Sequence, residues 1–158
     1  MSAGRILKTN HTGFAVSDLK RAANFFGDLL GFALSEPVRQ SGEAVARLTG
    51  VADAEIDIQF AYGYGCTVEL QHYVSPAGKR PLALQPCDAG FVHIAFEVDD
   101  VEAMAAKMSR AGYAPVSAPQ IVPAGPRKGG KNLYVRGPDN IVVEFQVAPQ
   151  GFKETLQS

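Results

Sequence analysis

Two histidines and two glutamates stand at matching positions in two stretches of this sequence. The first stretch contains HTGFAVSDL from residue 11 and TVELQ from residue 67. The second contains HIAFEVDDV from residue 93 and VVEFQ from residue 142. His11 therefore matches His93, and Glu69 matches Glu144. If a pseudo-twofold axis relates the two copies, these side chains converge as an N₂O₂ set. Such a set suits Zn²⁺, Ni²⁺, Co²⁺, Fe²⁺ or Mn²⁺ better than Ca²⁺ or Mg²⁺, which prefer oxygen ligands alone.

The residues beside the glutamates argue against an ordinary surface role. A single histidine in a strand is most often structural, and a single glutamate in a strand usually faces solvent. Here Val68 and Leu70 flank Glu69, and apolar residues also flank Glu144. A carboxylate among buried apolar neighbours needs a compensating partner. We therefore expect one divalent metal ion, bound by His11, Glu69, His93 and Glu144.

Each copy contains the same order of expected helices and strands. Apolar spacing predicts amphipathic helices over residues 19–30 and 101–111, each with an aspartate at its start and a glycine after it. The flanking segments alternate as strands do. The order is βαβββ twice, which predicts an α+β fold of two tandem modules whose curved mixed sheet forms a cleft around a metal site. The middle strands are expected at residues 34–38, 56–62, 114–117 and 132–135.

The boundaries of the modules follow from composition. The first copy is longer, and its additional residues fall near 43–53, where a short helix is expected. Residues 76–89 are rich in proline and are typical of a linker. We therefore expect a first module over residues 1–75, a linker over 76–89, a second module over 90–148 and a C-terminal tail over 149–158.

Four segments of the chain resemble the vicinal oxygen chelate superfamily. They are NHTGFAVSDLKRAANFFGDLLGF, TVEL, FVHIAFEVDDVEAMAAKMSRAGY and GPDNIVVEFQ, and together they cover most of residues 6–147. This superfamily includes glyoxalase I, methylmalonyl-CoA epimerase, extradiol dioxygenases, fosfomycin-resistance enzymes and bleomycin-binding proteins. The resemblance implies paired βαβββ modules around a metal, with ligands at His11, Glu69, His93 and Glu144. A complete His-Glu-His-Glu set resembles the glyoxalase and epimerase branch.

The resemblance also implies a reaction. It implies a metal-dependent isomerase, epimerase or lyase that acts on a small and possibly anionic substrate with vicinal oxygens. A metal acting as a Lewis acid stabilises the charge left when a proton departs beside a carbonyl, and a carboxylate can carry that proton. The resemblance gives that catalytic role to Glu144 or Glu69. A non-haem iron dioxygenase, or a resistance protein that binds a drug or metabolite, is the alternative.

Further residues are candidates for contacting the substrate. Residues 125–131 form a glycine-rich basic segment in which Arg127, Lys128 and Lys131 are placed to bind an anionic group, with a solvated loop as the alternative. Gln71 follows Glu69 by two positions and should point the same way along a strand. His72 should point the opposite way, so it is not expected to be a ligand.

Composition excludes several other classes of function. The formal net charge is −1, so no basic field is present to drive nucleic-acid or anionic-membrane binding. No run of about 18 apolar residues occurs, and the two cysteines form no disulfide framework. The expected location is the cytoplasm, and the expected assembly is a homodimer.

Overall fold

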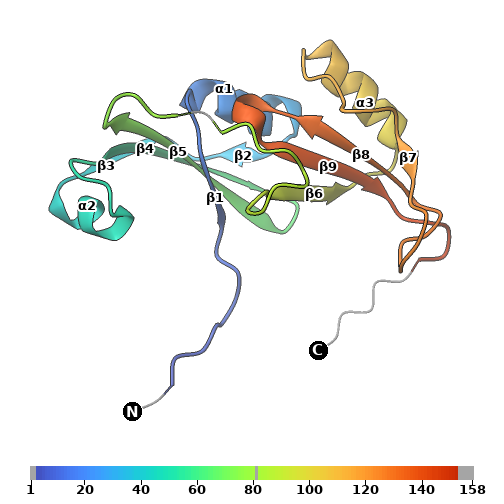
Figure 1. The fold of residues 1–158 in the computed structure, drawn as a ribbon, viewed down its shortest axis with the longest axis horizontal. Coiled ribbons are helices and arrows are strands. Elements are labelled where there is room, and N and C mark those ends of the chain that lie inside the picture. The colour runs from blue at the N-terminus through green and yellow to red at the C-terminus, as the bar shows by residue number, and fades with distance from the viewer. Residues whose placement is uncertain (1–2, 81, 153–158) are drawn as a thin grey trace. The chain divides into compact units, whose positions relative to one another are not determined.

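The computed structural model describes residues 3–80 and 82–152 of the 158-residue chain. The chain divides into two units, one ending at residue 81 and the other beginning at residue 82, and each unit is considered by itself. Each unit holds one mixed sheet with helices packed on it (Figure 1). The fold class is α+β, as the sequence predicts. Within the described residues, no helix is long and apolar enough to cross a membrane.

The first unit contains one five-stranded sheet. Its neighbouring strands follow the order β1-β5-β4-β2, and β3 also pairs with β4. The β1–β5 pair is parallel, whereas the other pairs are antiparallel. In chain order the elements are β1 (Thr12–Ala15), α1 (Leu19–Asn24), the π-helix η1 (Phe25–Leu29), β2 (Ala33–Leu34), β3 (Val38–Ser41), α2 (Glu43–Thr49), β4 (Glu55–Gly63) and β5 (Cys66–Ser75).

The second unit contains a four-stranded sheet in the order β6-β9-β8-β7. Its β6–β9 pair is parallel, as β1–β5 is in the first unit, so the two sheets repeat one topology. The predicted βαβββ order is therefore present in both units. The elements are β6 (His93–Glu97), α3 (Val101–Arg110), β7 (Gln120–Ile121), β8 (Lys131–Arg136), the 3₁₀ helix η2 (Pro138–Asn140) and β9 (Val142–Val147).

The first helix of each unit begins and ends through the same local interactions. The carboxylate of Asp18 accepts a hydrogen bond from the backbone N–H of Arg21, and Asp100 accepts one from Ala103. Each bond satisfies an N–H group that has no partner within the helix. Gly31 and Gly112 follow the helical segments with a φ of 84°. A side chain is unfavourable at that φ, so glycine ends each helical segment.

These helices cover the face of each sheet that lies opposite the two glutamates. Helix α1 packs on β4 and β5, and α3 packs on β8 and β9 (Figure 1). Val68 and Leu70, on either side of Glu69, are fully buried. Val143 and Phe145 are buried in the same way beside Glu144. Alternation along β5 and β9 therefore turns both glutamates toward the face that α1 and α3 leave uncovered.

Two of the predicted strands are placed differently in the structure. The strand expected at residues 34–38 is two short strands, β2 and β3, separated around Pro37. The strand expected at 114–117 is reduced to one isolated bridge between Pro115 and Val135, and β7 forms later in the chain. Proline has no N–H to donate to a neighbouring strand, which accounts for both interruptions.

The additional segment of the first unit is the short helix α2, as expected. Gly42 and Gly50 flank it, both with positive φ. Its Val45, together with Val51, packs on the buried residues Ile56 and Ile58 of β4. Because β4 residues that share a face alternate along the strand, this small cluster lies on the same face as Phe60 and Glu69.

Candidate metal centre

Glu69 lies in the middle strand of the first sheet, where β1 and β4 flank β5. Its register partners are Gly13 on β1 and Phe60 on β4. Only 8% of the residue is exposed, which is unusual for a glutamate. The position is buried because strands cover both edges of β5 and because its sequence neighbours enter the core.

His11 faces this carboxylate from the residue just before β1. Its Nε2 atom lies 3.3 Å from Oε2 of Glu69. Its Nδ1 atom lies 2.7 Å from the side-chain oxygen of Asn10, and its ring packs edge-on against Phe60. Both ring nitrogens thus face oxygen acceptors, and a proton held on Nδ1 by Asn10 would leave Nε2 free to bind a metal beside Glu69. This is the arrangement that a histidine ligand of a metal requires.

The second unit contains an equivalent pair. Nε2 of His93 lies 2.9 Å from Oε2 of Glu144, which is 5% exposed. Both histidine side chains are about one-third exposed, at 36% for His11 and 35% for His93, whereas the glutamate side chains beneath them are not. Each pair is therefore open to solvent on the histidine side only.

An aromatic side chain adjoins each pair. Phe60 is the register partner of Glu69, and Tyr134 is the register partner of Glu144. The ring of Tyr134 lies 5.1 Å from that of His93, measured between centroids. Burial raises the pKa of the Tyr134 phenol, and the charge of Glu144 raises it further. The phenol therefore remains a neutral hydrogen-bond donor at physiological pH.

An amide side chain donates a hydrogen bond to each glutamate. Nε2 of Gln71 donates to Oε2 of Glu69 at 2.6 Å. Nδ2 of Asn132 donates to Oε1 of Glu144 at 2.9 Å. Gln71 was expected near the site as a substrate contact, and the structure places it against the glutamate. Asn132 and Asn10 were not expected. An asparagine within a strand is itself uncommon, and that is the signal by which Asn132 stands out in the sequence.

The residues of each pair fit a divalent metal in type and in spacing. Two ligand atoms that are each about 2.1 Å from one ion lie about 3.0 to 3.4 Å apart at usual coordination angles. The nitrogen-to-oxygen separations of 3.3 Å and 2.9 Å are close to this range. Across residues 3–80 and 82–152, no group of three or more His, Cys, Asp or Glu side chains is placed to hold one metal ion. The structure thus shows His11 with Glu69 and His93 with Glu144 as two pairs.

The basic side chains of residues 125–131 contact nearby acidic groups. Both terminal nitrogens of Arg127 lie 3.0 Å from Oε2 of Glu97, and its guanidinium stacks on Phe152. Lys131 forms an ion pair with Glu102 of α3. Lys128 is exposed at the tip of a hydrogen-bonded turn. Arg127 and Lys131 are therefore already neutralised, and their binding to a substrate anion stays a prediction.

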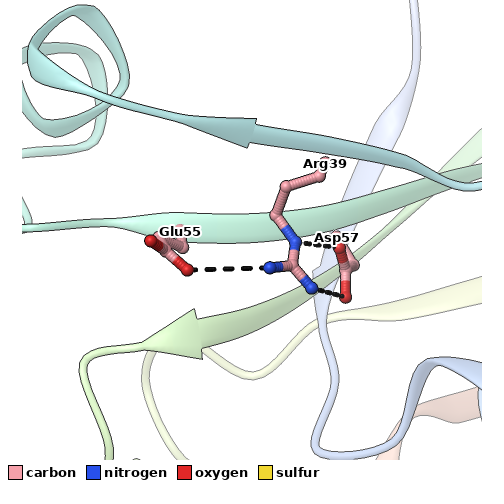
Figure 2. A network of polar contacts seen from close by, with 3 residues as sticks. All are labelled: Arg39, Glu55 and Asp57. Atoms are coloured by element: carbon pink, nitrogen blue, oxygen red, sulfur yellow. Dashed lines mark hydrogen bonds and ion pairs between the residues drawn. The ribbon is translucent and has the colours of Figure 1, made fainter.

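The opposite face of the first sheet carries a separate group of charges. Arg39 of β3 forms ion pairs with Asp57 and Glu55 of β4, as Figure 2 shows. Asp57 is the register partner of His72 on β5. Nδ1 of His72 lies 3.2 Å from the carbonyl oxygen of Val16. His72 thus points away from Glu69, as its position in the strand predicts.

A known protein family and known structures match most of this chain. Residues 8–145 match the Glyoxalase/Bleomycin resistance protein/Dioxygenase superfamily. The chain therefore belongs to this superfamily. It is 28% identical over 148 residues to a 2-epi-5-epi-valiolone epimerase from Actinomyces sp., a match that covers 90% of this chain and 80% of the relative.

Solved structures share the fold at low sequence identity. A glyoxalase family protein from Bacillus cereus superimposes with a TM-score of 0.80 at 20% identity, covering 94% of this chain and 99% of that one. The fosfomycin resistance protein FosX from Listeria monocytogenes, crystallised with Mn(II) and sulfate, superimposes with a TM-score of 0.61 at 13% identity. That match covers 94% of this chain and 98% of the other.

Proposed function

We propose that the chain is a metal-dependent epimerase or isomerase that moves a proton beside the carbonyl group of a small substrate with vicinal oxygens. The observation that carries the proposal is the pair of buried carboxylates, each within 3.3 Å of Nε2 of a histidine whose side chain is about one-third exposed. The relative from Actinomyces, whose name denotes an epimerase, supports a reaction that inverts a stereocentre.

We further propose that one divalent ion is shared by His11, Glu69, His93 and Glu144. The sharing is inferred from the sequence repeat, whereas the structure gives the distance and the burial within each histidine–glutamate pair. When bound, such an ion supplies Lewis acidity that stabilises negative charge on a substrate oxygen. The Mn(II) in the FosX crystals is consistent with a divalent ion in this superfamily.

The chain's own residues supply the remaining parts of the reaction. A carboxylate oxygen of Glu144 or Glu69 accepts the proton from carbon, and inversion of the centre follows when a proton is delivered to the opposite face. The Tyr134 phenol, which remains protonated beside His93, donates a hydrogen bond to a substrate oxygen. Phe60 stands at the equivalent position of the first unit without a hydroxyl. The second unit therefore has a hydroxyl donor beside its histidine–glutamate pair, and the first unit has an apolar ring at the equivalent position.

Exchange of a substrate proton with solvent deuterium tests this function. Metal-loaded protein is incubated without oxygen in D₂O with hydroxyketones, 2-oxo thioesters and hemithioacetals, and exchange at the α-carbon is followed by NMR. We expect exchange with at least one of these classes. Glu144→Gln and Glu69→Gln should each be tested, and loss of the proton carrier should slow exchange by about 10²- to 10⁴-fold. Glu36→Gln, an exposed glutamate outside the site, is the control.

Two results would replace this proposal. Stoichiometric consumption of oxygen with a strict need for iron would favour a dioxygenase. Saturable binding of a compound with neither exchange nor turnover would favour a binding protein.

A further inference from the structure

The two buried glutamates are held by hydrogen bonds in different ways. Oε1 of Glu144 accepts the amide of Asn132, while Oε2 faces Nε2 of His93 at the same distance of 2.9 Å. Each oxygen of Glu144 thus has its own partner. In Glu69 both contacts fall on Oε2, from Gln71 at 2.6 Å and from His11 at 3.3 Å.

The difference arises from one substitution between the repeated units, Ile58 in the first and Asn132 in the second. Gln71 and Gln146 occupy the same repeat position, two residues after the glutamate. Their register partners on the neighbouring strand are Ile58 and Asn132, respectively. In the first unit Ile58 cannot donate a hydrogen bond, and Gln71 contacts its own glutamate. In the second unit Asn132 contacts Glu144 from the next strand, and no hydrogen bond joins Gln146 to Glu144 among the described residues.

These contacts constrain the carboxylates to different degrees. Partners on both oxygens fix the rotation of the carboxylate plane as well as the position of the group. Partners on one oxygen fix mainly that oxygen. The amide of Asn132 also has one rotatable bond fewer between it and the backbone than the amide of Gln71, so it is held more firmly.

We propose that Asn132 is a positioning residue that fixes Glu144 as a rigid carboxylate ligand of the metal centre. The inference rests on the proposed function, since it assumes a metal at the His93–Glu144 pair. Asn132 leaves Oε2 directed toward His93 and removes the freedom of Oε1 to rotate into its place. The repeat-equivalent Ile58 does nothing comparable for Glu69, so the support is specific to the second unit.

Metal affinity and the visible spectrum of bound Co²⁺ test the proposal without a substrate. Asn132→Leu removes the amide at nearly constant volume, and Asn132→Ala removes it with no added apolar bulk. Loss of a hydrogen bond that orients a metal ligand typically weakens metal binding by about 10- to 100-fold. We expect both variants to show this rise in the Co²⁺ Kd and an altered d–d absorption band, because the carboxylate changes its mode of binding. Gln146→Leu, at the register partner of Asn132, should stay within about twofold of the wild type.

The outcomes separate the two proposals. If His93→Ala leaves Co²⁺ affinity unchanged, the metal centre itself is misassigned. If His93→Ala abolishes binding while Asn132→Leu and Asn132→Ala bind Co²⁺ with wild-type affinity and spectrum, the role of Asn132 is wrong and the centre stands. An equal loss in Gln146→Leu would also overturn the inference, because the effect would then be a general disturbance of β8 and β9. Circular dichroism of the apo proteins checks folding, and Asn132→Ala decides if Asn132→Leu does not fold.

Discussion

Replacing either proposed histidine ligand should strongly weaken binding of the same single metal ion. His11 and His93 belong to different units, yet the sequence repeat assigns both to one ion. We therefore expect one metal per chain in the wild type, and at most about half of that in either His11→Ala or His93→Ala at a metal concentration 100 times the wild-type Kd. His72→Ala is a matched control, because His72 lies on the opposite face and contacts the carbonyl oxygen of Val16.

The size of the effect follows from the role of each nitrogen. Each imidazole supplies an Nε2 atom within 3.3 Å of a buried carboxylate oxygen. Removing a direct ligand should cost more than removing a group that only orients one, so we expect affinity to fall by at least about 100-fold. At a metal concentration 100 times the wild-type Kd, the wild type gains about 2.7 kcal/mol of stability. A variant with 100-fold weaker binding gains about 0.4 kcal/mol.

Thermal unfolding with and without metal makes this difference measurable. For a chain of this size, 1 kcal/mol shifts Tm by about 2–4 °C. Metal should then raise the Tm of the wild type by about 5–11 °C and that of either variant by about 1–2 °C. Elemental analysis gives the stoichiometry in parallel. Two metals per wild-type chain, or a full metal-induced shift in either variant, would refute the shared four-ligand centre.

Three further predictions address assembly, packing and pH. Light scattering at micromolar concentration should give about twice the chain mass of 16.8 kDa, and the monomer mass would contradict a homodimer. Gly130→Ala should lower the free energy of unfolding by about 1–3 kcal/mol in urea titrations, because a Cβ there would lie 2.5 Å from the carbonyl oxygen of Val147. A change below about 0.5 kcal/mol would show that the backbone shifts to make room for the methyl group. Arg39 lowers the pKa of Asp57 through a hydrogen bond. The pair therefore stabilises the fold fully at pH values above the ordinary aspartate pKa of about 3.9, and this stabilisation is lost as the pH falls through the lowered pKa. The difference in urea midpoint between the wild type and Asp57→Asn should accordingly shrink between pH 6 and pH 3, and a difference that is independent of pH would contradict this origin.

Much of the architecture could be predicted because the sequence contains the same pattern twice. The repeated His-x-x-Phe-x-Val pattern placed β1 and β6, and apolar spacing with terminal glycines placed α1 and α3. The helical segment of the first unit continues into a π-helix over Phe25–Leu29, which apolar spacing does not distinguish from an α-helix. The strands expected across Pro37 and Pro115 are interrupted there because proline donates no N–H to a neighbouring strand.

The residue types of the candidate site could be predicted from the sequence, but the amide side chains that hydrogen-bond to the two glutamates could not. His11, Glu69, His93 and Glu144 stand out by repetition alone, and the structure pairs each histidine with its glutamate. The repeat also predicts that Gln71 and Gln146 should behave alike, and they do not. Whether an amide reaches a carboxylate depends on the residue opposite it on the next strand. The register between two strands cannot be predicted from the sequence of either strand alone.

Helix α2 has a consequence for the solubility of the first unit. Without it, Ile56 and Ile58 would form an uncovered apolar patch on β4, next to the short edge strand β3. Exposed apolar strands near an open sheet edge are common starting points for aggregation. Val45 and Val51 cover this patch from the inserted segment. The segment that lengthens the first copy therefore protects the sheet from self-association. Shortening this segment should lower the solubility of the protein before it prevents folding.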